Sequence, residues 1–353
     1  MRVAFTLEQC WHRVPGGTAV AALELARELE RRAEIELIGV AAAHRRPAPE
    51  PWRPPIPVRR LPLPRLALYE SWHLLRRPRV QWATGPVDVV HATGVAMPPR
   101  TAPLVLTIHD LSFLEYPEHF SRAGLRFFRR ALELARREAD LVLCSSEATL
   151  EHCAAAGFER ERLRHVPLGV RVQAAAGVAE VRSRYGLSAP YVLWTGTVEP
   201  RKNLPRLLTA FAALDRELEL VLVGPRGWNE DVPISSNVKL LGFVPADDLR
   251  ALYAGAEAFC FPSLMEGFGF PVLEAMAQGT PVVTSRGTST EELAGEAGIL
   301  VDPLDSASIA AGIERALASD GRLADAGRAR VAEYTWSRTA DLVLQAYEQV
   351  SLR

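Results

Sequence analysis

The sequence alternates short apolar segments with longer segments of helical spacing, and it does so in two separate series. A short apolar run is typical of a strand buried on both faces, as in a parallel sheet. Parallel strands need crossover connections, which are usually helices, so the alternation predicts an α/β protein. The predicted strands cover residues 2–7, 35–40, 88–92, 104–108, 141–144 and 164–167 in the first series, and 191–195, 219–223, 238–241, 258–261, 281–285 and 299–301 in the second.

Residues 171–189 separate the two series. They lose the hydrophobic pattern and are rich in alanine, glycine and serine, which is typical of a linker. A chain of 353 residues is long enough for two domains. We therefore expect two Rossmann-like domains that face a deep cleft, with the first at residues 1–172 and the second at residues 173–335, followed by a helix at residues 336–353.

Composition narrows the class of protein. Hydrophobic residues make up 48% of the chain and charged residues 24%, the balance of an ordinary globular protein. The formal net charge of −1 gives no field that favours nucleic acid. The four cysteines are scattered, which argues against a disulfide framework or a zinc site. The first strand follows Met1 almost at once, and no apolar run reaches the roughly 18 residues of a membrane span, so we expect a cytoplasmic protein.

The stretch at residues 261–279 indicates a ligand site. An apolar strand runs into a glycine-rich loop, and a proline is placed to begin a helix. Gly267 and Gly269 let a ligand approach the backbone, and the helix N-terminus favours an anion such as phosphate. Glu266 and Glu274 bracket this position, which suits a phosphate flanked by hydroxyl-rich groups, as in a nucleotide-sugar. The alternative is an ordinary strand–turn–helix connection.

Other positions indicate function more weakly. Gly16 and Gly17 precede a helical segment, where they either contact a phosphate or form a tight turn. His109 ends a predicted strand, the place where functional groups gather in open α/β sheets, although a structural role is the alternative. Of the 41 basic residues only Lys202 and Lys239 are lysines, which hints that residue 202 requires a compact point charge.

Two segments, residues 44–79 and 121–137, are rich in arginine and carry aromatic residues. Such segments are most often a solvated loop or a solvated helix face. They can also rest on anionic lipid headgroups. Peripheral contact with an anionic membrane, at the inner face of the cell membrane, is therefore a second interpretation.

Together these motifs resemble a known family. Glu266-x7-Glu274 with its Gly-Phe-Gly-Phe-Pro core resembles the signature of the retaining glycosyltransferases of family 4, which have the GT-B fold. The segment Gly-Thr-Val-Glu-Pro-Arg-Lys-Asn at residues 196–203 resembles the phosphate-binding loop of that family, in the form seen in bacterial mannosyltransferases. Further matches are His109-Asp110, Gly16-Gly17 and Tyr334-Thr335-Trp336.

The resemblance implies roles for the residues of the second domain. Arg201 and Lys202 would hold the donor diphosphate and offset the charge that builds on it as the glycosidic bond breaks. Glu266 would face the transferred sugar, and Glu274 would accept hydrogen bonds from the ribose hydroxyls. The backbone at residues 268–270 would share the contact with the diphosphate and touch the sugar, through Phe268, Gly269 and Phe270.

Other roles are implied for the remaining motifs. Gly16 and Gly17 would bring the backbone of the first domain to the phosphates, and His109 would lie by the outer hydroxyls of the sugar. Val244 would line the base pocket. Gly196 and Thr197 would belong to the donor site; Thr197 stands where many relatives carry an arginine, and Arg201 is the candidate that supplies this charge instead. The last helix would cross back onto the first domain.

The activity implied is the transfer of a hexosyl unit with retention of anomeric configuration. The donor would be GDP-mannose, with UDP-glucose, UDP-N-acetylglucosamine or a rhamnose donor as alternatives. The acceptor would be a glycan, a lipid-linked molecule or a small molecule. No Asp-x-Asp follows an apolar strand, so catalysis without a metal or other cofactor is expected. A UDP-sugar 2-epimerase and a non-catalytic nucleotide-sugar-binding subunit are the rival interpretations.

Overall fold

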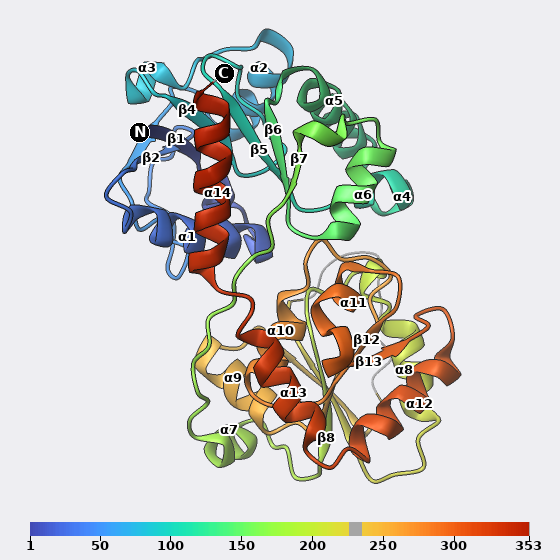
Figure 1. The fold of residues 1–353 in the computed structure, drawn as a ribbon. Coiled ribbons are helices and arrows are strands. Elements are labelled where there is room, and N and C mark those ends of the chain that lie inside the picture. Colours follow the sequence, from blue (N-terminus) through green and yellow to red (C-terminus); the bar gives the residue numbers. More distant parts are fainter. Residues whose placement is uncertain (226–234, 353) are drawn as a thin grey trace. The chain divides into compact units, whose positions relative to one another are not determined.

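The computed structural model describes residues 1–225 and 235–352 and divides the chain into two compact units (Figure 1). The first unit consists of Met1–Gly169 together with Trp336–Arg353, and the second consists of Val170–Thr335. The last helix of the chain thus belongs to the first unit. None of the helices in the described part is both long and apolar enough to cross a membrane.

The first unit is built on a parallel sheet of seven strands in the order β3-β2-β1-β4-β5-β6-β7. The order reverses between β1 and β4, and such a switch point leaves a crevice at the carboxyl ends of the strands. The strands are β1 (Arg2–Thr6), β2 (Glu36–Ala41), β3 (Val58–Arg60), β4 (Val89–Ala92), β5 (Leu104–Ile108), β6 (Leu141–Cys144) and β7 (Leu163–His165). The helices are α1 (Gly16–Glu30), α2 (Arg65–Leu75), α3 (Gln81–Thr84), α4 (Ser112–Glu115), α5 (Arg122–Glu138), α6 (Glu147–Ala155) and α14 (Trp336–Ser351).

Only the first part of the arginine-rich residues 44–79 is the solvated loop that their composition favours, since residues 44–57 contain no helix or strand and are mostly exposed. The rest of the segment contains β3 and α2, and the buried side chains of Leu61, Leu68 and Trp72 belong to the core of the first unit. Trp72 donates a hydrogen bond from its indole nitrogen to the carbonyl oxygen of Pro78 at 2.9 Å. The large aromatic residue of this helix is therefore a core residue and not a surface anchor.

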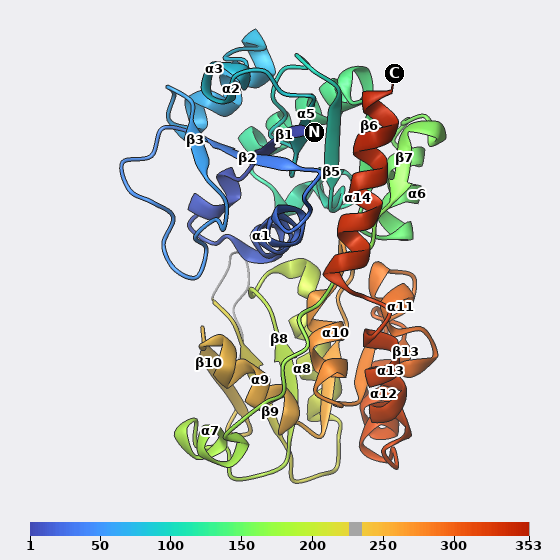
Figure 2. The ribbon, with the colours of Figure 1, turned by 60° about the vertical axis from the view of Figure 1, so that its left-hand side comes forward.

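The last helix, α14, lies beside α1 and against β4 and β5 (Figures 1 and 2). A buried hydrogen-bonded chain fixes it to the sheet: His91 Nδ1 of β4 lies 2.6 Å from Tyr347 Oη of α14, and His91 Nε2 lies 2.8 Å from Thr107 Oγ1 of β5. Burial, assisted by the nearby His109, lowers the pKa of His91 to about 3. The imidazole therefore stays neutral while it joins α14 to two strands.

Acid is expected to destabilise the protein through His91. In the unfolded chain this histidine binds a proton near its ordinary pKa of 6.5, whereas the folded site resists protonation down to about pH 3. Its stabilising contribution is thus complete above pH 6.5 and is lost as the pH falls toward 3. Between about pH 7.5 and pH 5 the free energy of unfolding should fall by about 2 kcal/mol from this group. Urea denaturation of wild type and His91→Gln at both pH values checks this, and equal pH dependence in the two proteins would contradict it.

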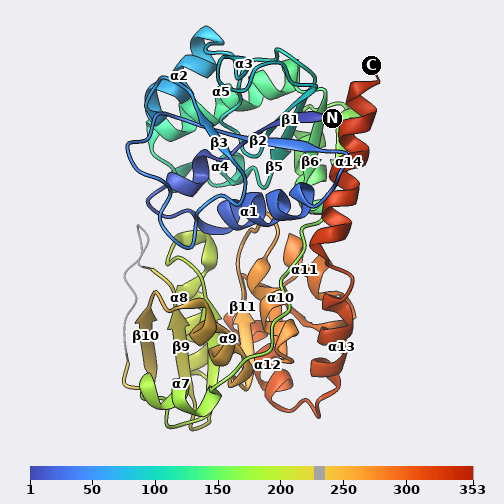
Figure 3. The ribbon, with the colours of Figure 1, turned by 90° about the vertical axis from the view of Figure 1, so that its left-hand side faces the viewer.

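The second unit is built on a parallel sheet of six strands in the order β10-β9-β8-β11-β12-β13. Figure 3 labels β10, β9 and β11 of this sheet. The switch point lies between β8 and β11, which are hydrogen-bonded neighbours. The strands are β8 (Tyr191–Thr195), β9 (Glu219–Val223), β10 (Val238–Gly242), β11 (Ala258–Phe261), β12 (Val282–Ser285) and β13 (Ile299–Val301). The helices are α7 (Val178–Arg184), α8 (Leu204–Ala212), α9 (Ala246–Ala254), α10 (Phe270–Ala277), α11 (Ser289–Ala294), α12 (Ser306–Leu317) and α13 (Arg322–Val331).

Candidate active site

The two predicted motifs of the second unit meet at the switch point. The segment 196–203 follows β8 and the segment 262–269 follows β11, so both loops leave the same edge of the sheet. The backbone N–H of Leu264 donates to the carbonyl oxygen of Arg201 at 2.8 Å. Asn203 Nδ2 donates to the carbonyl oxygen of Pro262 at 2.9 Å. These bonds hold the backbones of the two loops together at the place where open α/β sheets bind ligands.

Two cations and two carboxylates gather where the loops meet. Lys202 Nζ lies 2.6 Å from Glu266 Oε1, and Arg201 Nη1 lies 2.9 Å from Glu266 Oε2. Arg201 Nη2 lies 2.7 Å from Glu199 Oε1. The Lys202 ammonium also lies 4.6 Å from the centre of the Phe261 ring. The predicted residues Arg201, Lys202 and Glu266 are thus in direct contact, and sequence reasoning missed Glu199 as a partner although it lies inside the predicted loop.

Burial and charge act in opposite directions on this cluster. Burial by itself would raise the pKa of Glu266, but the charges of Arg201 and Lys202 outweigh it and lower this pKa to about 2. Burial lowers the pKa of Lys202, and the neighbouring Arg201 adds to this, whereas Glu266 opposes it. Glu266 is therefore ionised at any ordinary pH. The cluster is a buried site in which positive charge is kept in place by carboxylates.

Glu274 has a different environment, although it lies on the same stretch of sequence. It lies on α10, and Tyr253 Oη of α9 donates to Glu274 Oε2 at 3.0 Å. The same hydroxyl lies 2.8 Å from Thr195 Oγ1 at the end of β8. Burial raises the pKa of Glu274, although the hydrogen bond from Tyr253 opposes the shift. No signal in the sequence pointed to Tyr253, since it lies in a different helix, 21 residues before Glu274.

The loop before α10 is held by Ser289, a second residue that sequence reasoning missed. Ser289 Oγ lies 2.8 Å from the carbonyl oxygen of Glu266 and 2.9 Å from that of Phe268. Gly269 has a φ of +113°, and a Cβ there would lie 2.7 Å from Thr290 Cγ2. The position therefore requires glycine. Phe268 is buried, and its ring meets that of Phe270 edge-on at 5.1 Å.

The loop at residues 196–203, which follows β8, begins with a close contact between two glycines. Gly196 N–H donates to the carbonyl oxygen of Val223 at 2.9 Å. A Cβ on Gly224 would lie only 1.9 Å from the carbonyl oxygen of Gly196. Gly224 therefore shapes the loop, although its own sequence context drew no attention to it. Thr197, the next residue of the loop, is half-buried.

The predicted base-pocket residue lies apart from the charged cluster. Val244 is buried and follows β10, which is separated from β8 by β9 in the sheet. It thus lies toward the β10 edge of the same carboxyl-end face. In the part of the chain that the structure describes, no three side chains of the His, Cys, Asp and Glu types gather as metal ligands.

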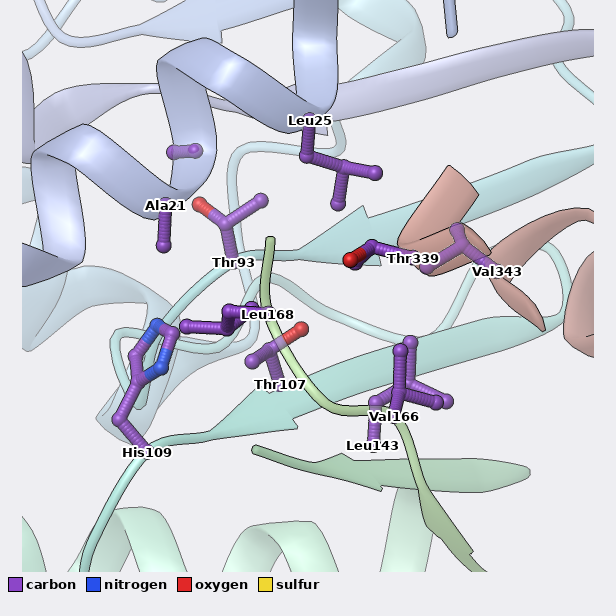
Figure 4. A pocket seen from close by; sticks show the side chains of 11 residues that line it. Ala21, Leu25, Thr93, Thr107, His109, Leu143, Val166, Leu168, Thr339 and Val343 are labelled. Atoms are coloured by element: carbon purple, nitrogen blue, oxygen red, sulfur yellow. The ribbon is translucent and has the colours of Figure 1, made fainter. Parts of the chain in front are cut away.

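The predicted residues of the first unit lie at the corresponding edge of its own sheet. Gly16 and Gly17 are exposed at the start of α1, and Gly16 has a φ of +62°. His109 follows β5 and lines a small pocket with Thr93 and Thr107 (Figure 4). Side chains of α1 and α14 complete the lining, among them Ala21, Leu25, Thr339 and Val343 (Figure 4). Burial lowers the pKa of His109, although Asp110 opposes the shift.

Two family models match the chain. The model described as "Glycosyltransferase Family 4" matches residues 15–174, and the model described as "Glycosyl transferases group 1" matches residues 189–319. The first match covers most of the first unit, and the second covers the loops that carry the charged cluster. Together they span both units.

Relatives of known function are similar over most of their length. The O-antigen chain mannosyltransferase B of Escherichia coli is 33% identical over 314 residues, which cover 82% of this chain and 81% of that protein. The MMP alpha-(1->4)-mannosyltransferase of Mycolicibacterium hassiacum is 31% identical over 304 residues, which cover 76% of this chain and 72% of that protein. Among solved structures, Anabaena HepE in complex with UDP-glucose superimposes with a TM-score of 0.75 at 21% identity, covering 99% of this chain and 100% of that chain. This likeness establishes the GT-B fold.

Proposed function

Because the chain belongs to family 4 of the glycosyltransferases, we propose that it transfers a hexosyl unit from a nucleotide diphosphate-sugar to a glycan or lipid-linked acceptor, with retention of configuration. The observation that supports this most directly is the cluster of Arg201, Lys202 and Glu266 at the switch point of the second sheet. A diphosphate leaving group gains negative charge as its bond to the sugar breaks. Fixed cations in a buried site stabilise that charge far better than water does.

The roles proposed for the carboxylates follow from their surroundings. Glu266 is ionised and adjoins the cations, which supports the proposal that it accepts hydrogen bonds from hydroxyls of the sugar next to the diphosphate. Glu274, with Tyr253 as its partner, is the proposed acceptor of hydrogen bonds from the ribose. Neither is proposed as a nucleophile. The attack takes place on the same face as the departing phosphate, which helps to deprotonate the acceptor. The parts assigned to Gly16, Gly17 and His109 stay predictions.

The donor is proposed to be GDP-mannose. The form of residues 196–203 favours it, and two relatives that are named mannosyltransferases are similar over most of their length. The UDP-glucose complex of the HepE structure, which shares the fold at lower identity, keeps a UDP-sugar as the second candidate. The name of the Escherichia coli relative supports a surface glycan as the acceptor.

A screen of nucleotides tests this function. A ligand that binds only the folded state raises the melting temperature, so GDP should raise it more than UDP or ADP does. Transfer should then be seen from GDP-mannose to a membrane or glycan extract, and it should persist in EDTA because catalysis is proposed to need no metal. A response to UDP alone would overturn the choice of mannose. Loss of transfer in EDTA would overturn the metal-free scheme.

Peripheral contact of the first unit with an anionic membrane also stays a prediction, as does a cytoplasmic location. Leu74 and Leu75 at the end of α2 and Trp82 of α3 are exposed, and Arg77 and Arg79 lie between them in the sequence. Exposed apolar side chains next to arginines suit the interface of an anionic bilayer. Co-sedimentation with liposomes checks this, and binding that does not depend on anionic lipid would contradict it.

A further inference from the structure

Glu266 forms ion pairs with both of the cations that the proposed function assigns to the donor diphosphate, Arg201 and Lys202. Its Oε1 lies 2.6 Å from Lys202 Nζ, and its Oε2 lies 2.9 Å from Arg201 Nη1. The two oxygens of one carboxylate thus bind the cations as two phosphate oxygens would. We infer that Glu266 is an internal substitute for the diphosphate: a nucleoside diphosphate must displace this carboxylate from Arg201 and Lys202 and thereby releases it toward the sugar. This inference rests on the proposed function and gives Glu266 a second role at the same site.

Burial explains why such a substitute is needed. The side chains of Lys202 and Glu266 are each only 8% exposed, and that of Arg201 is 26% exposed. A buried charge without a partner is strongly unfavourable, so these cations need an anion at all times. Glu266 provides one from within the chain, and a diphosphate can take its place without leaving the cations unpaired.

The exchange requires side chains to move but not the backbone. Ser289 Oγ, within hydrogen-bonding distance of the carbonyl oxygens of Glu266 and Phe268, holds the loop that carries the carboxylate. The hydrogen bond from Leu264 N–H to the Arg201 carbonyl holds the loop that carries the cations. Arg201 also keeps a second carboxylate, because its Nη2 lies 2.7 Å from Glu199 Oε1. Arg201 Nη1 can therefore exchange its partner Glu266 for a phosphate oxygen while the ion pair with Glu199 keeps the guanidinium oriented.

The exchange couples recognition of the diphosphate to recognition of the sugar. As long as Glu266 is bound to Arg201 and Lys202, its oxygens are engaged and cannot accept hydrogen bonds from sugar hydroxyls at full strength. Once phosphate oxygens take over the cations, the carboxylate becomes available. Two ligand parts that each favour the same rearrangement bind cooperatively. A free hexose, which lacks the diphosphate, is thus discriminated against.

The Glu266→Gln variant tests the inference, because it removes the competing charge. Calorimetric titration with inorganic pyrophosphate, with the nucleoside diphosphate that binds best and with the corresponding nucleoside gives three affinities. Both phosphate ligands should bind the variant on the order of tenfold more tightly than they bind wild type, since the charge-assisted bonds of Glu266 to Lys202 and Arg201 no longer have to be broken. The nucleoside should bind equally to both proteins. Unchanged or weaker binding of pyrophosphate by the variant would overturn the inference.

Glu274→Gln is the matched control, because it neutralises a carboxylate of the same stretch whose hydrogen-bond partner is Tyr253 and not a cation. It should leave pyrophosphate binding unchanged and weaken binding of the nucleoside diphosphate. If pyrophosphate affinity rises equally in both Gln variants, the gain reflects general charge removal and the inference fails.

A second pair of variants covers the case in which Glu266→Gln does not fold, since that change leaves Lys202 buried without its carboxylate. In the single variant Lys202→Met, the ion pair between Glu266 and Arg201 remains. The double variant Lys202→Met/Glu266→Gln removes both charges of the Lys202–Glu266 ion pair. Pyrophosphate should bind the double variant more tightly than the single one, because Arg201 is then released. Equal affinities would overturn the inference.

Failure of the proposed function gives a different result. If Glu266→Gln gains affinity for pyrophosphate but wild type transfers no sugar from any nucleotide donor, the proposed function fails and the inference stands. If wild type transfers sugar but the variants gain no affinity, the inference fails alone. A structure of the pyrophosphate complex in which Lys202 Nζ stays bonded to Glu266 would also overturn the inference.

Discussion

Replacement of Lys202 by alanine is expected to lower kcat/KM for sugar transfer by about three orders of magnitude. Lys202 is a buried lysine at the switch point of the second sheet, and its ammonium lies next to the position proposed for the diphosphate. Removal of one fixed group that stabilises charge in a transition state typically costs 10²–10³ in rate, and a full charge belongs at the upper end of that range. Initial rates at several donor concentrations measure the effect.

Lys239→Ala is the control, because Lys239 is the other lysine of the chain and lies on β10 of the same unit, paired with Glu219 at 2.8 Å. Its rate of transfer should stay within about twofold of wild type, as expected for a partly exposed ion pair. The melting temperature of both variants is measured in parallel, so that a folding defect is recognised. Full activity of Lys202→Ala would contradict the proposed role of this residue.

Replacement of Gly224 by alanine is expected to destabilise the protein by about 2–4 kcal/mol and to abolish most of the transfer activity. The added Cβ would lie 1.9 Å from the carbonyl oxygen of Gly196, and this contact cannot be relieved unless the loop at residues 196–203 moves. The residue also has a φ of +140°, which side-chain-bearing residues rarely adopt. Chemical denaturation gives the stability, and the same transfer assay gives the activity.

Gly242→Ala separates these two causes. Gly242 accepts a hydrogen bond from the N–H of Gly224 at 2.8 Å and also has a positive φ, of +71°. A Cβ at Gly242 meets no heavy atom within 4 Å. Its replacement should therefore cost only about 1 kcal/mol of backbone strain and leave most activity intact. Equal losses in the two variants would show that strain, and not the contact with Gly196, decides the effect.

Much of the fold could be predicted because the signals are local. Strands such as β8 and β11 are buried apolar runs that end at glycine or proline, and each predicted strand of both series is present in the structure. Parallel strands buried on both faces must be nearly continuous runs of apolar residues, which makes them easy to find in a sequence. The loops after β8 and β11 were recognised for the same reason, since their motifs are contiguous.

The segment at residues 44–79 shows where composition misleads. Its arginines and prolines favoured a loop, yet Leu68 and Trp72 are spaced one helical turn apart and bury one face of α2 in the core. Long arginine side chains can lie along the outside of such a helix without preventing the burial of its apolar side. Here a short amphipathic pattern outweighed the overall composition.

The two carboxylates of the central stretch show the limit most clearly. In the sequence Glu266 and Glu274 are both acidic residues of one stretch, and only the family resemblance gives them different roles, on the sugar and on the ribose. In the structure Glu266 is paired with Arg201 and Lys202 and has a lowered pKa, whereas Glu274 is hydrogen-bonded to Tyr253 and has a raised pKa. The partners come from other segments of the chain, so no local pattern could show that the two carboxylates differ in partner and in the direction of their pKa shift.

The sequence by itself thus determined the two α/β units, the two loops of the candidate donor site and the residue types in them, because hydrophobic period and glycine-rich motifs act over a few neighbouring residues. Only the tertiary structure decided which strands are neighbours, that β8 and β11 flank the switch point, and that Glu266 is paired with Arg201 and Lys202, the two cations proposed to bind the diphosphate. Strand order and ion pairing depend on contacts between residues that are far apart in the sequence. Lys202 and Glu266, for example, are separated by 64 positions. Such contacts form only when the sheet is assembled.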